Sequence, residues 1–296
     1  MRLGTAGAEE RAEYSNMSAT TQTSLVAAVR PEAQSGVRKQ EGVLQYKDLL
    51  LMLIWRDIKI RYKQSIMGFF WAILMPILII GSGLIVMLAV STLSGRPINK
   101  LDVLSVAIKA VPWAFCVAAI RFGTNSLVSN KELVTKIYFP REILPIAAVF
   151  ANLFDFAVAG GVLTVILGIL RVGANWQILW VPLLLVLLIL LTVGCALFLA
   201  CANLFFRDVK YLVEVFLTYG IFFTPVFYSA SKLGKWGPIV LLNPIGSILE
   251  CLNNVIILGR PPQLPWLIYS AVWAFCGSLL AWRIFRRAES AFAESI

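Results

Sequence analysis

The sequence predicts an all-α integral membrane protein with six transmembrane helices, an N-terminal amphipathic interface helix and a re-entrant outer helical hairpin. Two compositional features point to a membrane, because 59% of the 296 residues are hydrophobic and only 14% are charged. A soluble domain usually has about 25% charged residues. Apolar runs of about 20 residues, the length that crosses a bilayer, also recur along the chain. These observations exclude a water-soluble enzyme.

The first 42 residues are rich in Ala, Ser, Thr, Glu and Gln, which predicts a disordered cytoplasmic tail without the apolar stretch of a secretory signal. Residues 43–64 follow as the interface helix. Its apolar residues share one helical face and its basic residues share the other. The apolar face comprises Leu51, Ile54, Trp55, Ile58 and Tyr62, and the basic face comprises Arg56, Lys59 and Lys63. A buried helix of a small cytosolic domain is the alternative.

A six-span permease domain is predicted for residues 65–290. The expected spans are residues 66–93, 103–128, 143–170, 178–202, 211–228 and 264–284. Several prolines fall inside these spans or near their ends, and at four of them we expect helix kinks. They are Pro76, Pro112, Pro182 and Pro225.

A further apolar run, residues 239–258, is long enough to be a seventh span. The pair Asn243-Pro244 and Gly246 interrupt it, and Glu250, Asn253 and Asn254 make its second half polar. Two short helical pieces fit a re-entrant or interfacial hairpin better than a crossing. We therefore predict an outer hairpin over residues 231–262.

Basic residues support the six-span count. The net charge of +10 would suggest nucleic acid in a soluble protein, but here it indicates positive flanks, and no nucleic-acid partner is expected. With six spans and both termini in the cytoplasm, 18 basic residues lie inside and six outside. A seventh span would place Arg283, Arg286 and Arg287 outside, against this bias.

Several kinds of chemistry are excluded. Histidine is absent, which removes the commonest general base and metal ligand near neutral pH. No P-loop motif or G-x-S-x-G motif occurs, so nucleotide hydrolysis must occur on another chain. The five scattered cysteines predict apolar packing, with neither disulfides nor a metal site.

Four charged side chains lie within the predicted spans away from their last residues: Lys109, Arg121, Asp155 and Glu214. Charges at membrane depth are costly and are usually paired or functional. Because the second and third spans are antiparallel, Asp155 falls at a depth between Arg121 and Lys109, and we expect it to pair with one of them. A proton relay is the less favoured alternative.

Two predicted cytoplasmic loops stand out. Residues 130–141 begin with Asn130 and end near Pro140, which predicts a short helix across the membrane base. Residues 203–209 (NLFFRDV) form the second loop. Two solvated turns without a function are the alternative.

Five segments in order carry a family resemblance. They are RYKQSIMGFFWA (61–72), SLVSN (126–130), LVTKIYFPR (133–141), FFRDV (205–209) and LNP (242–244). Together they closely resemble the permease subunit of bacterial polysaccharide ABC exporters, which move O-antigen, capsular polysaccharide and teichoic acid. The resemblance covers about residues 45–290 and leaves out the N-terminal tail.

The resemblance implies a homodimer in the bacterial inner membrane that binds two copies of a P-loop ABC ATPase and exports a lipid-linked polysaccharide. It implies no cofactor, no metal and no catalytic residue on this chain, with ATP and magnesium on the partner. The interface helix and the two loops would then contact the ATPase. The candidate coupling residues are Trp55, Arg56, Lys59, Lys131, Glu132, Leu133, Lys136, Tyr138, Phe139, Arg141, Arg207 and Asp208. The outer hairpin would act as a gate, with Asn243, Pro244 and Glu250 as candidate residues.

Aromatic side chains are candidates for the glycan path, because sugar rings can stack on them. The candidates are Phe69, Phe70, Trp71, Trp113, Tyr219, Phe222, Phe223, Phe227 and Tyr228, with Phe115 and Phe122 beside Trp113. Lipid contact or interfacial anchoring is the alternative for each. A permease for a small lipid or drug-like substrate shares this topology, whereas a membrane glycosyltransferase would need D-x-D-like acidic clusters that the sequence lacks.

Overall fold

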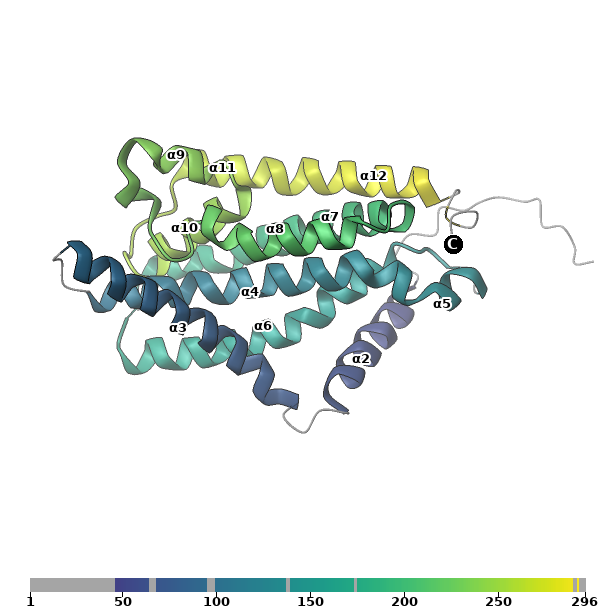
Figure 1. Cartoon of the computed structure of the whole chain (residues 1–296), viewed down its shortest axis with the longest axis horizontal. Coiled ribbons are helices and arrows are strands. Elements are labelled where there is room, and N and C mark those ends of the chain that lie inside the picture. The colour runs from purple at the N-terminus through teal and green to yellow at the C-terminus, as the bar shows by residue number, and fades with distance from the viewer. Residues whose placement is uncertain are drawn as a thin grey trace, which may run out of the picture. The chain divides into compact units, whose positions relative to one another are not determined.

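The computed structural model describes residues 46–63, 68–94, 99–136, 139–172, 175–289 and 292. Within these ranges the chain forms helices and turns and no strand, which confirms the all-α prediction (Figure 1). The tail predicted for residues 1–42 lies outside the described residues. The longer helices are α2 (Lys47–Lys63), α3 (Gly68–Ser94), α4 (Lys100–Ser129), α6 (Ile143–Ile169), α7 (Val181–Phe205), α8 (Val209–Phe223), α10 (Pro244–Ile256), α11 (Leu264–Val272) and α12 (Ser278–Ala288).

Four helices of the described part are long and apolar enough to cross a membrane. They are Lys100–Ser129, Ile143–Ile169, Trp176–Phe205 and Leu264–Ala288. The last contains α11 and α12, joined through one π-helical turn, Trp273–Gly277. These four match the second, third, fourth and sixth predicted spans.

The first and fifth predicted spans correspond to α3 and α8. Helix α3 has 27 residues, whereas α8 has only 15. Helix α8 ends at Phe223 because Thr224 leaves the helical conformation and Pro225 follows, and proline cannot donate the next helical hydrogen bond. Pro225 thus ends this helix instead of kinking it, and the helix predicted through residue 228 is too long.

Helix α4 is the central element of the described structure and packs against α6 and α7 (Figure 1). Most of its residues are buried, although Pro112 interrupts its hydrogen bonding. Gly123 makes the close approach to α7 possible, since a Cβ at this position would lie 2.6 Å from the Cβ of Ala196.

Helix α2 contacts α6, while two residues of its predicted apolar face are exposed. Leu51 and Trp55 are 62% and 60% exposed, whereas Leu53 is buried. Polar contacts orient the helix: Arg61 Nη1 donates to the Asn152 side chain at 3.1 Å and also pairs with Asp155, as does the Tyr62 hydroxyl. These polar contacts cannot be predicted from the hydrophobic periodicity of the helix alone.

The expected partner of Asp155 is therefore wrong. Asp155 binds Arg61 of α2, not Lys109 or Arg121. Lys109 instead lies 3.6 Å from a Glu250 carboxylate oxygen, and Arg121 binds Glu214. The prediction was based on charges within the spans, whereas the partner of Asp155 is a cation that the preceding helix brings to α6.

The predicted break at Asn243-Pro244 is present, because α9 (Gly237–Leu241) and α10 are separate helices. Asn243 caps α10 by accepting a hydrogen bond from the Ile245 N–H at 3.1 Å. The polar residues of α10 are buried inside the protein: Glu250 is 5% exposed and Asn253 is 3% exposed. Lys109, fully buried in α4, donates to the Tyr228 carbonyl at 2.6 Å and so joins this segment to the centre of the fold.

Candidate functional site at the base of the helices

We define the base as the end of the helices at which α4 ends, α5 (Lys131–Lys136) follows and α7 turns into α8 (Figure 1). The short helix predicted in residues 130–141 is present as α5. Asn130 ends α4 by donating to the Ser126 carbonyl at 2.8 Å, and its own carbonyl accepts from the N–H groups of Leu133 and Val134. One residue thus ends the long helix and starts the short one.

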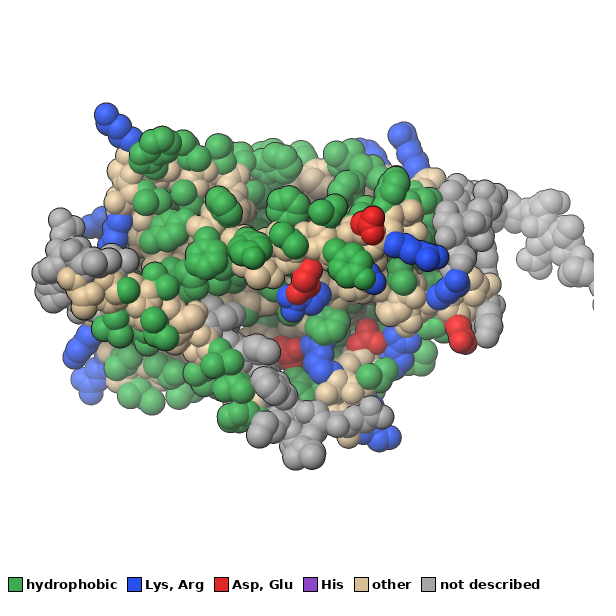
Figure 2. Space-filling view, in the orientation of Figure 1, with side chains coloured by type: hydrophobic (Ala, Val, Ile, Leu, Met, Phe, Trp, Pro, Cys, Tyr) green, Lys and Arg blue, Asp and Glu red, His purple; other side chains and the backbone are tan. Residues whose placement is uncertain are grey.

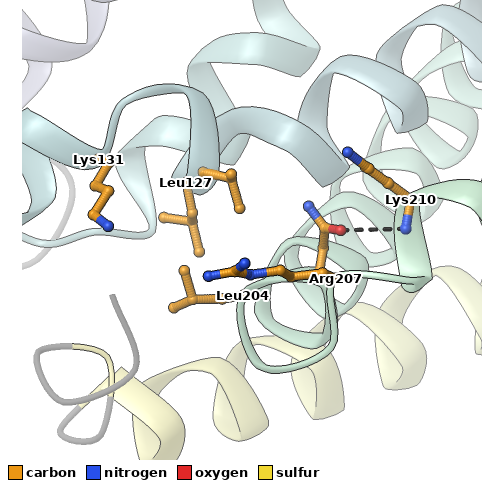
Figure 3. Close-up of a pocket in the computed structure, with 7 residues that line it drawn as sticks. Leu127, Lys131, Leu204, Arg207 and Lys210 are labelled. Atoms are coloured by element: carbon orange, nitrogen blue, oxygen red, sulfur yellow. Dashed lines mark hydrogen bonds between the residues drawn. The ribbon is translucent and has the colours of Figure 1, made fainter.

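A pocket of about 180 Å³ lies at the base, between the end of α4 and the turn that joins α7 to α8. The two predicted cytoplasmic loops therefore meet at one site. Figure 3 shows Arg207 extending from the α7–α8 turn toward the side on which Lys131 lies. We call this site the basic pocket, which is lined by Leu127, Val128, Lys131, Asn203, Leu204, Arg207 and Lys210.

Asn203 forms the buried wall of the basic pocket. Its amide donates to the Thr124 carbonyl of α4 at 3.0 Å, and its oxygen accepts from the Lys210 backbone N–H at 3.2 Å (Figure 3). The side chain is 2% exposed, so both hydrogen bonds are shielded from water. Asn203 thereby holds the start of α8 against α4.

The cations around the basic pocket lack acidic partners. Its lining contains three basic residues and no Asp or Glu. Within the described residues, the Lys131 and Arg207 side chains make no hydrogen bond or ion pair, and the Lys210 ammonium lies 4.7 Å from the centroid of the Tyr211 ring. Such a concentration of unneutralised positive charge favours an anionic ligand.

The other side of the base carries charges that are neutralised internally. The Glu142 carboxylate is 1% exposed and accepts from Trp282 Nε1 at 2.7 Å and from Arg286 Nη2 at 3.2 Å. Arg141 Nη1 donates to the Glu289 carbonyl at 2.9 Å. We call these five residues the C-terminal corner, which joins the start of α6 to the end of α12.

The predicted coupling residues divide between these two places. Lys131 and Arg207 line the basic pocket, and Asp208 and Glu132 are exposed near it. Arg141 belongs to the C-terminal corner instead.

The apolar coupling residues are partly inside. Phe139, expected on a docking face, is 8% exposed because it packs into the hydrophobic cluster under the base. Leu133 is half-buried at the edge of the same cluster.

The predicted coupling residues of α2 lie beside the base. Arg56 donates to Asn130 Oδ1 at 2.9 Å and pairs with Asp57, so α2 is tied to the junction of α4 and α5. Lys59 and Trp55 are exposed and lie together, with the ammonium 5.7 Å from the ring centroid. Tyr138 and the Lys136 side chain lie outside the described part of the structure.

The predicted path aromatics do not form one group. Tyr219, Phe222 and Phe223 are 59%, 60% and 75% exposed on α8, and Phe70 is 53% exposed on α3. Figure 2 shows one face of the molecule, on which hydrophobic side chains predominate and charged ones are few.

The other path candidates are inside or not described. Trp113 and Phe227 are 5% and 9% exposed, and Phe115 is also buried, so these three belong to the core. Tyr228 is half-buried, and its hydroxyl donates to the Phe222 carbonyl at 3.0 Å. The side chains of Phe69 and Trp71 lie outside the described residues.

Three residues with a part in these contacts were not among the predicted site residues. Lys210 and Asn203 complete the basic pocket, and the spacing of Lys210 three positions after Arg207 was the one available signal. Arg61 was missed because its partner is 94 positions away. Among the described residues, no group of three or more Cys, Asp or Glu could hold a metal ion.

Comparison with known proteins adds a family match. The family model described as "ABC-2 type transporter" matches residues 48–257. The chain is 26% identical over 263 residues to the O-antigen export system permease protein RfbA of Myxococcus xanthus, covering 88% of this chain and 100% of that protein. It is 24% identical over 252 residues to a Klebsiella pneumoniae protein of the same name, covering 83% of this chain and 94% of the relative.

Proposed function

Because the chain belongs to the ABC-2 type transporter family, we propose that it is the transmembrane subunit of an ATP-driven exporter of a lipid-linked polysaccharide. The substrate moves from the cytoplasmic to the periplasmic side of the inner membrane. The observation that carries this proposal is similarity over nearly the full length of two proteins named as O-antigen export permeases.

In the proposed topology, α3 and α8 add two spans to the four long apolar helices, and both termini are cytoplasmic. The distribution of basic residues supports this orientation, since the base carries Lys131, Arg207 and Lys210 and therefore faces the cytoplasm. The segment of residues 231–262 then forms a re-entrant gate hairpin at the periplasmic end. Single cysteines at Lys232 and Arg260 should both react with an impermeant thiol reagent added from the periplasm, and labelling from opposite sides would contradict the hairpin.

The proposed energy source is a separate P-loop ATPase, present in two copies, which binds ATP and magnesium. The sequence has no P-loop, so ATP acts on this chain only through contacts that differ between two states of the partner. The basic pocket suits this role, because its unpaired cations fit acidic side chains of the ATPase. It also touches both α5 and the start of α8, so a partner held there can move two helices together.

The proposed substrate path lies between two copies of the chain. Three observations support it: α8 is apolar, it packs on α4 and α7, and its aromatic side chains Tyr219, Phe222 and Phe223 are exposed. A second copy against this surface would remove the aromatics from lipid and place sugar-stacking rings along the interface. A transporter of a small lipid or drug-like amphiphile is the alternative, since it would use the same arrangement.

The test of the proposed function uses the chain purified together with its ATPase in lipid nanodiscs. A polyprenyl-linked glycan should stimulate ATP hydrolysis, whereas drug-like amphiphiles should not. Deletion of the gene should remove surface glycan, and expression of the parent should restore it. Stimulation by amphiphiles alone, with surface glycan unchanged in the deletion strain, would favour the alternative.

A further inference from the structure

A bidentate ion pair joins α4 to α8, between the base and the exposed aromatic residues Tyr219, Phe222 and Phe223 along α8. Arg121 Nε donates to Glu214 Oε2 at 2.8 Å, and Arg121 Nη2 donates to Glu214 Oε1 at 2.6 Å. The two side chains are 42% and 50% exposed in the chain alone. The pair therefore presents charge on the surface of a helix that is otherwise apolar there.

This exposure distinguishes the pair from two other ion pairs of the long helices, Lys109–Glu250 and Arg61–Asp155, whereas the Asp102–Lys232 pair near the start of α4 is exposed as well, at 33% and 59%. Lys109 and Glu250 are 0% and 7% exposed, and Arg61 and Asp155 are both 26% exposed. Those two pairs are shielded by protein, as charges within a membrane protein usually are. An ion pair that served only to link α4 to α8 would be expected to be shielded from lipid in the same way.

The position of the pair makes lipid an unsuitable neighbour. Arg121 lies eight residues before the end of α4, which places it about 12 Å from the base along the helix axis. That depth is within the hydrocarbon region of a bilayer about 30 Å thick, if α4 crosses it. Charged side chains at such depth usually face a polar path, and they often mark where a substrate or ion passes.

The neighbouring side chains indicate what kind of ligand would fit. Phe122 follows Arg121 and is 48% exposed, while Tyr211, one helical turn before Glu214 on α8, is 63% exposed. Aromatic rings suit sugar rings and prenyl chains, whereas the guanidinium fork suits a phosphate, which it can bind through two parallel hydrogen bonds. A polyprenyl-phosphate-linked glycan contains all of these groups.

We propose that Arg121 binds the phosphate of the lipid-linked substrate and that Glu214 occupies the Arg121 guanidinium when no substrate is present. This rests on the proposed function and assigns a binding site to it. The carboxylate and the phosphate compete for the same two N–H donors, so the substrate opens the α4–α8 ion pair. The nearby cation Arg61, whose guanidinium carbon is 4.5 Å from the centroid of the Phe122 ring, is neutralised by Asp155 and so plays no direct part.

The test measures binding of labelled undecaprenyl phosphate to the full chain with its ATPase in phosphatidylcholine nanodiscs. Arg121→Gln should weaken binding at least tenfold, because the phosphate loses its donors. Glu214→Gln should bind as tightly as the parent or a few-fold tighter, because it removes the competing carboxylate. A purely structural ion pair predicts that both variants lose binding alike, and that result would overturn the proposal.

Three controls keep the result interpretable. Undecaprenol, which lacks phosphate, should bind the parent and both variants equally. Arg121→Lys keeps the charge but loses the fork, so it should show an intermediate loss even if Arg121→Gln fails to fold. Lys100→Gln, an exposed position at the start of α4 and at the other end of the helix from the base, should leave binding unchanged.

The source of the phosphate is tested by competition. Excess phosphatidylglycerol should displace undecaprenyl phosphate poorly, and equal displacement by it would overturn the substrate assignment in favour of ordinary phospholipid. Surface glycan in cells is scored separately. If the parent restores export while Arg121→Gln binds undecaprenyl phosphate normally, the phosphate site is wrong and the proposed function stands.

Discussion

The two sides of the base differ in how their charges are neutralised, although both lie at the same end of the same helices. In the C-terminal corner, the buried Glu142 carboxylate is matched by Trp282 and Arg286. In the basic pocket, Lys131 and Arg207 have no acidic partner among the described residues. Their shared place at one end of the helices therefore does not explain why one set of charges is paired and the other is not. The contrast fits the proposed roles, in which the corner stabilises the fold and the pocket binds the ATPase.

The largest effect should come from breaking the C-terminal corner. We expect Glu142→Ala to lower the free energy of unfolding by about 3 kcal/mol, since it leaves a half-buried indole N–H and a guanidinium without their acceptor. Unfolding of the purified protein in detergent by heat or denaturant measures this loss. Asp208→Ala removes an exposed carboxylate and should change the unfolding midpoint little. Equal effects of the two substitutions would contradict the assigned roles.

Much of the corner was beyond prediction from sequence. Glu142 and Trp282 are 140 positions apart, and nothing in the local pattern around either residue specifies the other. Charge placement did predict that the base is basic, and the caps at Asn130 and Pro140 predicted the short helix α5. Local features of the site were thus predictable, whereas long-range pairing was not.

The same division holds for the fold. Apolar runs predicted the four long helices within a few residues, because length and composition determine them locally. The partner of Asp155 was predicted wrongly, because it depends on Arg61 reaching a different helix. Burial of Trp113 and Phe227 could not be predicted from the sequence either, since an apolar run does not show which of its aromatic residues face the protein core.

The second prediction concerns the basic pocket. Arg207→Glu with Lys210→Glu should weaken binding of the ATPase at least tenfold, because it reverses the charge that acidic partner groups would contact. The unfolding midpoint should stay near that of the parent, since Arg207 makes no bond within the described chain. Copurification and titration with the ATPase measure the binding. Lys100→Glu, a matched reversal at the far end of α4, should leave it unchanged.

Failure of the charge reversal would be informative. If the double variant still binds its ATPase at the parental affinity, the pocket does not form the contact. The exposed pair of Trp55 and Lys59 on α2 would then become the leading candidate surface.

The third prediction tests whether the pocket wall is structural. Asn203→Ala should lower the free energy of unfolding by about 1–2 kcal/mol, because the Lys210 N–H loses its acceptor and the Thr124 carbonyl loses its side-chain donor. It should also weaken ATPase binding a few-fold by releasing the start of α8. Loss of binding without any loss of stability would instead mean that Asn203 contacts the partner directly.

The smallest expected effect is a difference in salt dependence between the basic pocket and the C-terminal corner. Raising the salt concentration from about 0.1 to about 1 M shortens the screening length from about 10 to about 3 Å, which weakens interactions between exposed charges far more than those between buried ones. The dissociation constant of the ATPase should therefore rise a few-fold, because the cations of the basic pocket are exposed. The unfolding midpoint of the parent should change little, because the Glu142 carboxylate is only 1% exposed and its ion pair with Arg286 is partly shielded. The measurement is a titration with the ATPase at both salt concentrations, paired with unfolding at both. Salt-independent binding would show that apolar contacts, such as those of Leu127 and Leu204, dominate in the pocket.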